Sequence, residues 1–218
     1  MRAMRAGVLA LQGSSEPHLR RLADLGQSEG PNHGIVPVEV RQKRQLEGLT
    51  HLILPGGEST TIRHLLDLFG LTPELVARSR GGELCLYGTC AGAILLGQDD
   101  GTRPARLGLL DATLTRNAYG RQVDSFARDV ELKLEGDVRN IRATADDAAG
   151  PFHCVFIRAP RFVAVGSGVD VLGSLDGEPI LVEAPGLLAG TFHPELTRDL
   201  RVHRHFLAMQ PAARSISA

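Results

Sequence analysis

Tryptophan, long apolar runs and any large excess of one charge are missing from this sequence of 218 residues. Lys and Arg number 24 against 25 Asp and Glu, and the net charge of −1 gives no reason to expect a nucleic-acid or anionic membrane surface. No apolar run approaches membrane-spanning length, and Val8–Leu11, after a basic N-terminus, is too short for a signal peptide. We therefore expect a cytoplasmic protein with no nucleic acid and no membrane among its partners.

Cysteine is also scarce. The chain has only Cys85, Cys90 and Cys154, an odd number in which no pair shows the Cys-x-x-Cys spacing of zinc and redox sites. This pattern argues against a disulfide framework and fits a reducing compartment.

The length and composition favour one large α/β domain. Hydrophobic residues make up 43% of the chain and charged residues 22%, which is ordinary for a globular protein. The length allows a sizeable core but is short for two domains. We expect a single domain over residues 1–209 and a mobile tail over residues 210–218.

In the first half of the chain, short apolar runs alternate with helical patterns. Strands are predicted over residues 6–11, 35–40, 51–54 and 84–87, and helices over 19–25, 62–69, 72–81 and 93–96. Gly26 is the expected end of the first helix, and Gln27–Gly34 an expected loop or insertion. This alternation predicts a mostly parallel central sheet.

Beyond Gly97 the apolar runs become shorter and alternate, which predicts antiparallel hairpins added to the parallel core. These runs cover residues 109–115, 130–134, 154–157, 162–165, 169–175 and 179–182. The polar stretch Asp137–Pro151 is an expected surface loop. A last helix is predicted over Arg198–Met209, with His203 and His205 on different, solvated faces.

The stretch Gly-Thr-Cys-Ala-Gly over residues 88–92 stands between an apolar strand and an apolar helix. This is the cysteine form of a nucleophile elbow, in which two glycines allow a turn tight enough to expose the central side chain. The helix that follows would favour a thiolate at Cys90. The alternative is that Cys90 is a small buried residue in a tight turn.

A second loop, Pro55–Thr61, has two glycines before a helix, so its backbone N–H groups could face a ligand. The alternative is a plain strand-to-helix turn capped by Ser59 or Thr60. A phosphate-binding P-loop is excluded, because the Gly-Lys-Ser/Thr ending is missing.

Near the C-terminus, His193 and Glu195 flank Pro194. In an extended segment, residues two apart point to the same side. A thiol nucleophile needs a base and the base needs an orienting acceptor, so Cys90, His193 and Glu195 form a coherent catalytic set. Alternatively, His193 is a structural histidine and Glu195 is a carboxylate stabilised by the dipole at the start of a helix. The two could also be metal ligands, but the sequence offers no further cluster of His or carboxylate residues to supply a third and fourth ligand.

Three motifs together resemble the triad (class I) glutamine amidotransferases: Pro-Gly-Gly-Glu-Ser-Thr-Thr at 55–61, Gly-Thr-Cys-Ala-Gly at 88–92 and Phe-His-Pro-Glu-Leu at 192–196. Within this group, the chain is more similar to the glutaminase subunits of pyridoxal phosphate synthase. The further matches, which span nearly the whole chain, are 9–13, 116–117, 119–126 and 155–160.

The resemblance implies a three-layer α/β fold and hydrolysis of L-glutamine to glutamate and ammonia, with no cofactor and no metal. Cys90 would be the nucleophile, His193 the general base and acid, and Glu195 its orienting partner. The N–H groups of Gly57 and Ala91 would form the oxyanion hole.

The resemblance also implies where glutamine binds and where the ammonia goes. The implied substrate-binding residues are Gly57, Glu58, Ser59, Arg116, Ile157 and Arg158. The implied partner is the barrel-shaped synthase subunit, which would form a hetero-oligomer with this chain and use the ammonia to make vitamin B6. The alternatives are a glutaminase serving a different synthase, a non-catalytic regulatory or scaffold subunit on the same fold, and a cysteine peptidase on a related fold.

Overall fold

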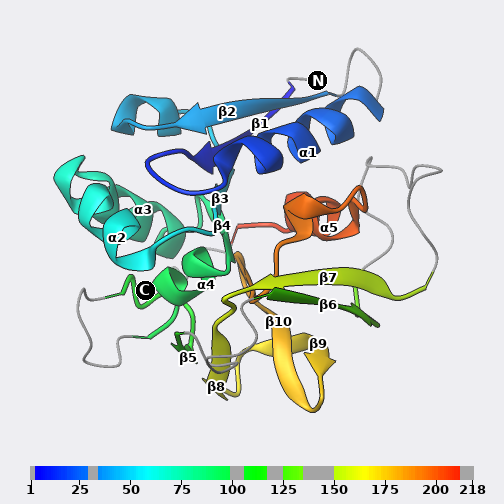
Figure 1. The fold of residues 1–218 in the computed structure, drawn as a ribbon. Helices are drawn as coiled ribbons and strands as arrows, with labels where there is room; N and C mark the ends of the chain where they lie inside the picture. Colours follow the sequence, from blue (N-terminus) through cyan, green and yellow to red (C-terminus); the bar gives the residue numbers. More distant parts are fainter. Residues whose placement is uncertain (1–2, 29–33, 99–105, 117–124, 135–149, 212–218) are drawn as a thin grey trace, which may run out of the picture.

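A computed structural model describes residues 3–28, 34–98, 106–116, 125–134 and 150–211 (Figure 1). The expected loops at Gln27–Gly34 and Asp137–Pro151 and the expected tail at 210–218 fall largely outside these ranges. Among the helices in these ranges, none has the length and apolar character needed to cross a membrane.

The strands are β1 Met4–Leu9, β2 Ile35–Val40, β3 His51–Leu54, β4 Cys85–Thr89, β5 Ala112–Thr115, β6 Ser125–Val130, β7 Phe152–Ile157, β8 Arg161–Val165, β9 Asp170–Leu175, β10 Glu178–Ala184 and β11 Leu187–Gly190. The α-helices are α1 Ser15–Ser28, α2 Ser59–Leu68, α3 Leu71–Arg80, α4 Ala91–Leu96 and α5 Arg201–Ala208, and the 3₁₀ helices are η1 Lys43–Leu46 and η2 Pro194–Leu196.

The central sheet has seven strands in the order β2-β1-β3-β4-β11-β10-β9. The first five strands in this order pair in parallel, whereas β10 is antiparallel to both of its neighbours. Two further antiparallel pairs, β5 with β8 and β6 with β7, form separate small sheets. The predicted mostly parallel sheet with added antiparallel strands is therefore confirmed.

Two apolar cores lie on opposite faces of this sheet and make the fold three-layered. One core packs α2, α3 and α4 on side chains such as Leu54 and Leu86. The other packs α1 and α5 on side chains such as Val8 and Tyr87. Figure 1 shows α2 to α4 on one side of β3 and β4, and α5 on the other. Burial of both faces explains why the central strands are continuous apolar runs.

The register of the sheet brings the functional loops to one edge. Gly190 at the end of β11 pairs with Thr89 at the end of β4, and Leu54 at the end of β3 pairs with Gly88. Because parallel strands end at the same edge, the segments that follow β1, β3, β4 and β11 gather there.

Several helix boundaries differ from the predictions: α1 begins at Ser15 rather than at Leu19, and α5 covers Arg201–Ala208 rather than Arg198–Met209. Helix α1 does not end at Gly26 but runs on to Ser28. A Cβ at Gly26 would lie 2.6 Å from the Ile35 carbonyl oxygen, so this glycine permits close packing of the helix on β2. The N-cap of α2 is neither Ser59 nor Thr60 but Glu58, whose carboxylate accepts from two backbone N–H groups.

Two strands of the second half were not predicted correctly. The run predicted over residues 130–134 overlaps only the end of β6, which begins at Ser125. Strand β11, Leu187–Gly190, was not predicted as a strand, although it is fully buried between β4 and β10.

The prediction that His203 and His205 are solvated is wrong, because both are buried on α5. His203 lies within hydrogen-bonding distance of another buried histidine, His18, with 2.9 Å between His203 Nε2 and His18 Nδ1. His205 Nε2 lies 2.5 Å from a Glu183 carboxylate oxygen. Each imidazole is thus accommodated by a polar partner from a distant part of the chain.

His51, at the start of β3, makes the fold sensitive to acid. Its Nε2–H donates to the Met209 carbonyl oxygen at 3.1 Å, and the Thr50 hydroxyl donates to Nδ1 at 2.9 Å. Burial lowers the pKa of His51 from 6.5 to about 4, although the bond to Met209 opposes the shift. Below pH 6.5 the His51 imidazole is therefore protonated in the unfolded chain, whereas in the folded chain it stays neutral until the pH falls to about 4.

We expect the contribution of His51 to stability to be complete above pH 6.5 and to be lost as the pH falls to about 4. A shift of this size corresponds to about 3 kcal/mol. Urea unfolding at several pH values should show a shallower acid loss for His51→Leu than for the unmodified chain, whatever its stability at pH 7. Equal pH slopes for the two proteins would contradict the assignment.

Candidate active site

Cys90 lies in the sharp turn between β4 and α4. Its backbone angles, φ 50° and ψ −105°, are strained for a residue with a side chain. The turn is held by a hydrogen bond from the Cys90 N–H to the Gly190 carbonyl oxygen at 2.8 Å. It also depends on Gly92, because a Cβ there would lie 1.9 Å from the Leu54 carbonyl oxygen. The elbow therefore requires this glycine.

His193 follows β11, the strand next to β4, so it comes alongside Cys90. The side chains of His193 and Cys90 both lie beside Gly56. A Cβ built on Gly56 would be 2.5 Å from His193 Cε1 and 3.4 Å from Cys90 Cβ. The His193 N–H also donates to the Val155 carbonyl oxygen at 2.8 Å and so fixes the segment.

Glu195 lies behind His193, away from the pocket. The His193 Nδ1 and the Glu195 Oε1 are 2.7 Å apart, and the Glu195 side chain is fully buried. Burial lowers the pKa of His193, but contacts with Cys90 and Glu195 outweigh it and raise the pKa to about 10. Burial raises the pKa of Glu195, but the nearby His18 and His193 lower it to about 2. At neutral pH the site therefore holds the Glu195 carboxylate and the His193 imidazolium beside the Cys90 side chain.

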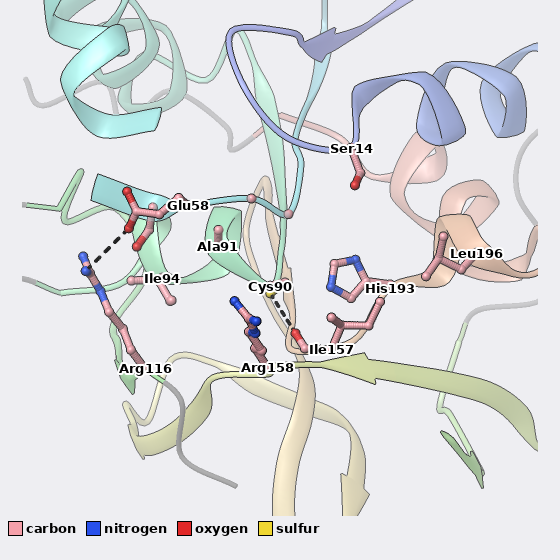
Figure 2. Close-up of a pocket in the computed structure, with 13 residues that line it drawn as sticks. Ser14, Glu58, Cys90, Ala91, Ile94, Arg116, Ile157, Arg158, His193 and Leu196 are labelled. Atoms are coloured by element: carbon pink, nitrogen blue, oxygen red, sulfur yellow. Dashed lines mark hydrogen bonds and ion pairs between the residues drawn. The ribbon is translucent and has the colours of Figure 1, made fainter. Parts of the chain in front are cut away.

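A pocket of about 530 Å³ opens over these residues (Figure 2). Nine of the ten residues predicted for the site line it, namely Gly57, Glu58, Ser59, Cys90, Ala91, Arg116, Ile157, Arg158 and His193. The tenth, Glu195, contacts His193 from behind. Residues from five separate segments of the sequence therefore meet in one cavity.

The charged rim of the pocket is formed by Glu58 and Arg116. The Arg116 Nη1 lies 4.0 Å from the Glu58 Oε1, a contact drawn in Figure 2. The same nitrogen donates to Thr60 Oγ1 at 2.9 Å. Burial raises the pKa of Glu58, but hydrogen bonds from Thr60 and Thr61 lower it to about 2. Glu58 is therefore a negatively charged carboxylate at neutral pH, and it lies beside the positively charged guanidinium of Arg116.

The opposite wall comes from the end of β7. The Cys90 Sγ lies 3.8 Å from the Ile157 carbonyl oxygen, a contact drawn in Figure 2. The next residue, Arg158, has a positive φ of 45° and projects its side chain toward the cavity near Cys90. Two non-glycine residues with positive φ, Cys90 itself and Arg158, therefore meet at the thiol.

The sequence analysis missed the contribution of the loop after β1. The Gln12 side-chain oxygen accepts from the Glu58 N–H at 2.9 Å, and the Ser14 N–H donates to the Gly56 carbonyl oxygen at 3.0 Å. Gly13 has a φ of 98°, and a Cβ there would lie 2.0 Å from the Gly56 carbonyl oxygen. The signal that was available is Gln12-Gly13 directly after an apolar strand, at the edge where the other loops meet.

Four further lining residues were not among the predicted site residues: Ser14, Gly56, Ile94 and Leu196. Among the residues that the structure describes, no group of three or more His, Cys, Asp or Glu side chains is placed to hold a metal ion.

The arrangement, a thiol beside an imidazole that is paired with a carboxylate, can carry out nucleophilic attack on an acyl carbon.

The comparisons with known proteins agree with this chemistry. Residues 8–211 match the SNO glutamine amidotransferase family. The pyridoxal 5'-phosphate synthase subunit PdxT of Thermus thermophilus is 47% identical over 205 residues, which cover 93% of this chain and 96% of that protein. The subunit of the same name from Moorella thermoacetica is 44% identical over 207 residues, covering 94% of this chain and 99% of that protein.

Solved structures give the same picture. A crystal structure described as a glutamine amidotransferase superposes with a TM-score of 0.77 at 46% identity, covering 93% of this chain and 96% of that one. A glutamine amidotransferase of Thermotoga maritima shares the fold at 14% identity, with a TM-score of 0.56 over 95% of this chain and 83% of that one.

Proposed function

Because the chain belongs to the SNO glutamine amidotransferase family, we propose that it is the glutaminase subunit of a pyridoxal 5'-phosphate synthase. It hydrolyses L-glutamine to glutamate and ammonia and supplies the ammonia to a synthase subunit for vitamin B6 synthesis. The observation that carries the proposal is the pairing of His193 with Glu195 beside Cys90, inside a pocket large enough for an amino acid.

In the first half of the proposed reaction, the Cys90 thiolate attacks the side-chain carboxamide carbon of glutamine. The negative charge that develops on the carboxamide oxygen is held by the N–H groups of Gly57 and Ala91, which both line the pocket. The His193 imidazolium then gives its proton to the leaving nitrogen, so that ammonia departs and a γ-glutamyl thioester remains on Cys90.

In the second half, the neutral His193 accepts a proton from water, and the resulting hydroxide attacks the thioester carbon. Glutamate leaves, and the Cys90 thiolate and His193 imidazolium are restored. Glu195 keeps the imidazole in one orientation through Nδ1, which leaves Nε2 for the proton transfers. The raised pKa of His193, about 10, keeps this imidazole protonated at neutral pH, ready to give its proton to the leaving nitrogen.

Glutamine carries one positive and one negative group at its α-carbon, and the pocket offers a partner for each. Glu58 suits the α-ammonium, while Arg116 and Arg158 suit the α-carboxylate. Ser59 and the Ile157 carbonyl supply further polar contacts at the same walls. This charge pattern supports a free amino acid rather than a peptide as the substrate.

We expect Arg116→Met to raise the KM for glutamine roughly tenfold and to change kcat much less, since a charge-assisted hydrogen bond to the substrate contributes about 1.5–3 kcal/mol. Initial rates over a range of glutamine concentrations measure this. Arg20→Met, on the exposed face of α1 where Arg20 pairs with Glu16, is the control and should leave both constants unchanged. An unchanged KM in Arg116→Met would contradict the role of Arg116.

We propose residues 1–209 as a single glutaminase domain, because one sheet contains strands from both ends of this range, β1 and β11. The three cysteines are free thiols, which supports a reducing, cytoplasmic location. The relatives are named as subunits of a synthase, which supports a hetero-oligomer with a separate synthase chain.

The test is glutamate release from L-glutamine by the full chain, alone and mixed with its synthase subunit. We expect release that the synthase subunit stimulates strongly. Release without stimulation would contradict the proposed partner and favour a glutaminase serving another synthase. No release under either condition would contradict the glutaminase function and favour a regulatory subunit.

A further inference from the structure

Glu195 has a second neighbour that the proposed mechanism does not use. Its Oε1 faces His193, but its Oε2 lies 3.3 Å from Nε2 of His18, and both side chains have no exposed surface. Within the described residues, Oε2 has no hydrogen-bond partner of good geometry, and His18 Nε2 is the ionisable group that faces it as a close contact. A fully buried carboxylate oxygen without compensation is costly, so the contact with His18 matters to the state of Glu195.

His18 comes from α1 and belongs to a buried polar chain. Its Nε2 also lies 3.2 Å from Thr89 Oγ1, in the residue before Cys90. Its Nδ1 lies 2.9 Å from Nε2 of His203, which α5 contributes. The chain therefore runs from His203 through His18 to Glu195 and His193, and it connects two helices on one face of the sheet to the catalytic pocket.

The contacts select one tautomer for each histidine. A lone pair on His18 Nε2 would face the Glu195 carboxylate, so this nitrogen carries the hydrogen, which it donates to Thr89 Oγ1 at 3.2 Å. Its Nδ1 is then an acceptor, and His203 Nε2–H donates to it. The remaining nitrogen, His203 Nδ1, is a buried atom without a hydrogen-bond partner in the part of the chain that the structure describes. This fits a neutral ring with a lone pair there.

We propose that His18 is a positioning residue that holds Oε2 of Glu195, so that Oε1 stays aligned on His193. His203 fixes the tautomer of His18 from behind. The inference rests on the proposed function, since it assigns to His18 a role in preparing the base of that reaction.

The surroundings of His18 support this role. Burial lowers the pKa of His18, and this outweighs the opposing effect of Glu195, so the ring is neutral at pH 7. Burial also lowers the pKa of His203, to about 3. A neutral ring that keeps its Nε2–H beside Oε2 stabilises the carboxylate through the dipole of the N–H group and leaves the charge of Glu195 available to the His193 imidazolium.

The test compares His18→Leu with His18→Gln. A glutamine side chain places an N–H donor near the position of the histidine Nε2, whereas leucine fills space without a donor. The readout is the rate at which iodoacetamide alkylates Cys90 between pH 5 and pH 10, followed by peptide mass spectrometry on the full chain. Cys85 and Cys154 are fully buried, so alkylation of the folded protein reports Cys90.

For His18→Leu we expect alkylation at pH 6 to fall at least about fivefold and the pH midpoint to rise, because a misaligned carboxylate no longer supports the thiolate–imidazolium pair. His18→Gln should keep most of the unmodified rate. His51→Leu is the matched control: this buried histidine packs on Phe206 of α5 but has no contact with Glu195, so its profile should not move. Thermal unfolding followed by circular dichroism confirms that each variant is folded during the assay.

An unchanged profile in His18→Leu would overturn the inference. Equal losses of alkylation rate in His18→Leu, His18→Gln and His51→Leu would also overturn it. Such a result would show that the rate depends on packing and not on an N–H donor at position 18. The proposed function is tested separately by glutamate release from the unmodified chain. If the chain releases no glutamate but His18→Leu alone shifts the alkylation profile, the glutaminase function fails and the positioning role stands.

Discussion

Replacing Cys90 with alanine is expected to lower kcat/KM for glutamine hydrolysis at least about 10⁴-fold in the complex with the synthase subunit. Without the sulfur no thioester can form, and the His193–Glu195 pair has no nucleophile to activate. Residual turnover would depend on water reaching a bound substrate, with help only from the oxyanion donors. An enzyme-coupled assay of glutamate measures the loss.

The other two cysteines provide matched controls. Cys85→Ala and Cys154→Ala should stay within about threefold of the unmodified activity, provided that they fold. Burial raises the pKa of both thiols to about 12, and both point into the core away from the pocket. A Cys90→Ala variant that releases glutamate at the unmodified rate would show that the nucleophile is another residue.

The second large effect concerns Gly92. We expect Gly92→Ala to destabilise the protein by at least about 3 kcal/mol, because forcing extra atoms into a packed site strains the backbone. The new Cβ would lie 1.9 Å from the Leu54 carbonyl oxygen and 2.7 Å from its carbon. Helix α4 would have to move away from β3, and Cys90 would move with it. Urea unfolding gives the loss of stability, and Cys90 alkylation reports the local change.

Gly168 is the control for this substitution. A Cβ there has open space, with no atom within 4 Å, so Gly168→Ala should change the stability by less than about 0.5 kcal/mol. If Gly92→Ala were as stable as Gly168→Ala, the close packing of the elbow on β3 would be contradicted.

The parallel part of the fold could be predicted because its signals are local. The predicted strands over 35–40 and 51–54 match β2 and β3 residue for residue, since each is an apolar run bounded by polar or turn residues. The elbow is equally local, because five consecutive residues specify it. The link from Cys90 to His193 depended instead on chemical reasoning, since the register of β4 and β11 that joins them is not visible in the sequence.

The strands of the second half of the chain were harder to predict for physical reasons. Strand β11 has only four residues and owes its existence to pairing on both sides, which is a long-range effect. Strand β6 includes Arg128 and Asp129, and its burial pattern is mostly exposed or intermediate. Its conformation comes from its partner β7 rather than from an apolar pattern.

The site residues that were missed act through side chains that meet only after folding. Gln12 supports the glycine loop from a neighbouring strand end. His18 lies four residues before Leu22 and seven before Leu25, on the buried stripe of α1. That spacing was a usable signal, because a histidine on a buried helical stripe needs a polar partner. The identity of the partner, Glu195, required the structure.

The most direct test of the account is to trap the covalent intermediate. The full chain, in complex with its synthase subunit, is mixed with L-glutamine, quenched in acid during steady-state turnover and analysed by mass spectrometry. Nucleophilic catalysis by Cys90 predicts a mass increase of one γ-glutamyl group on the peptide that contains Cys90, and none in Cys90→Ala. Glutamate release by the unmodified protein without this adduct, or with an adduct on another residue, would contradict nucleophilic catalysis by Cys90.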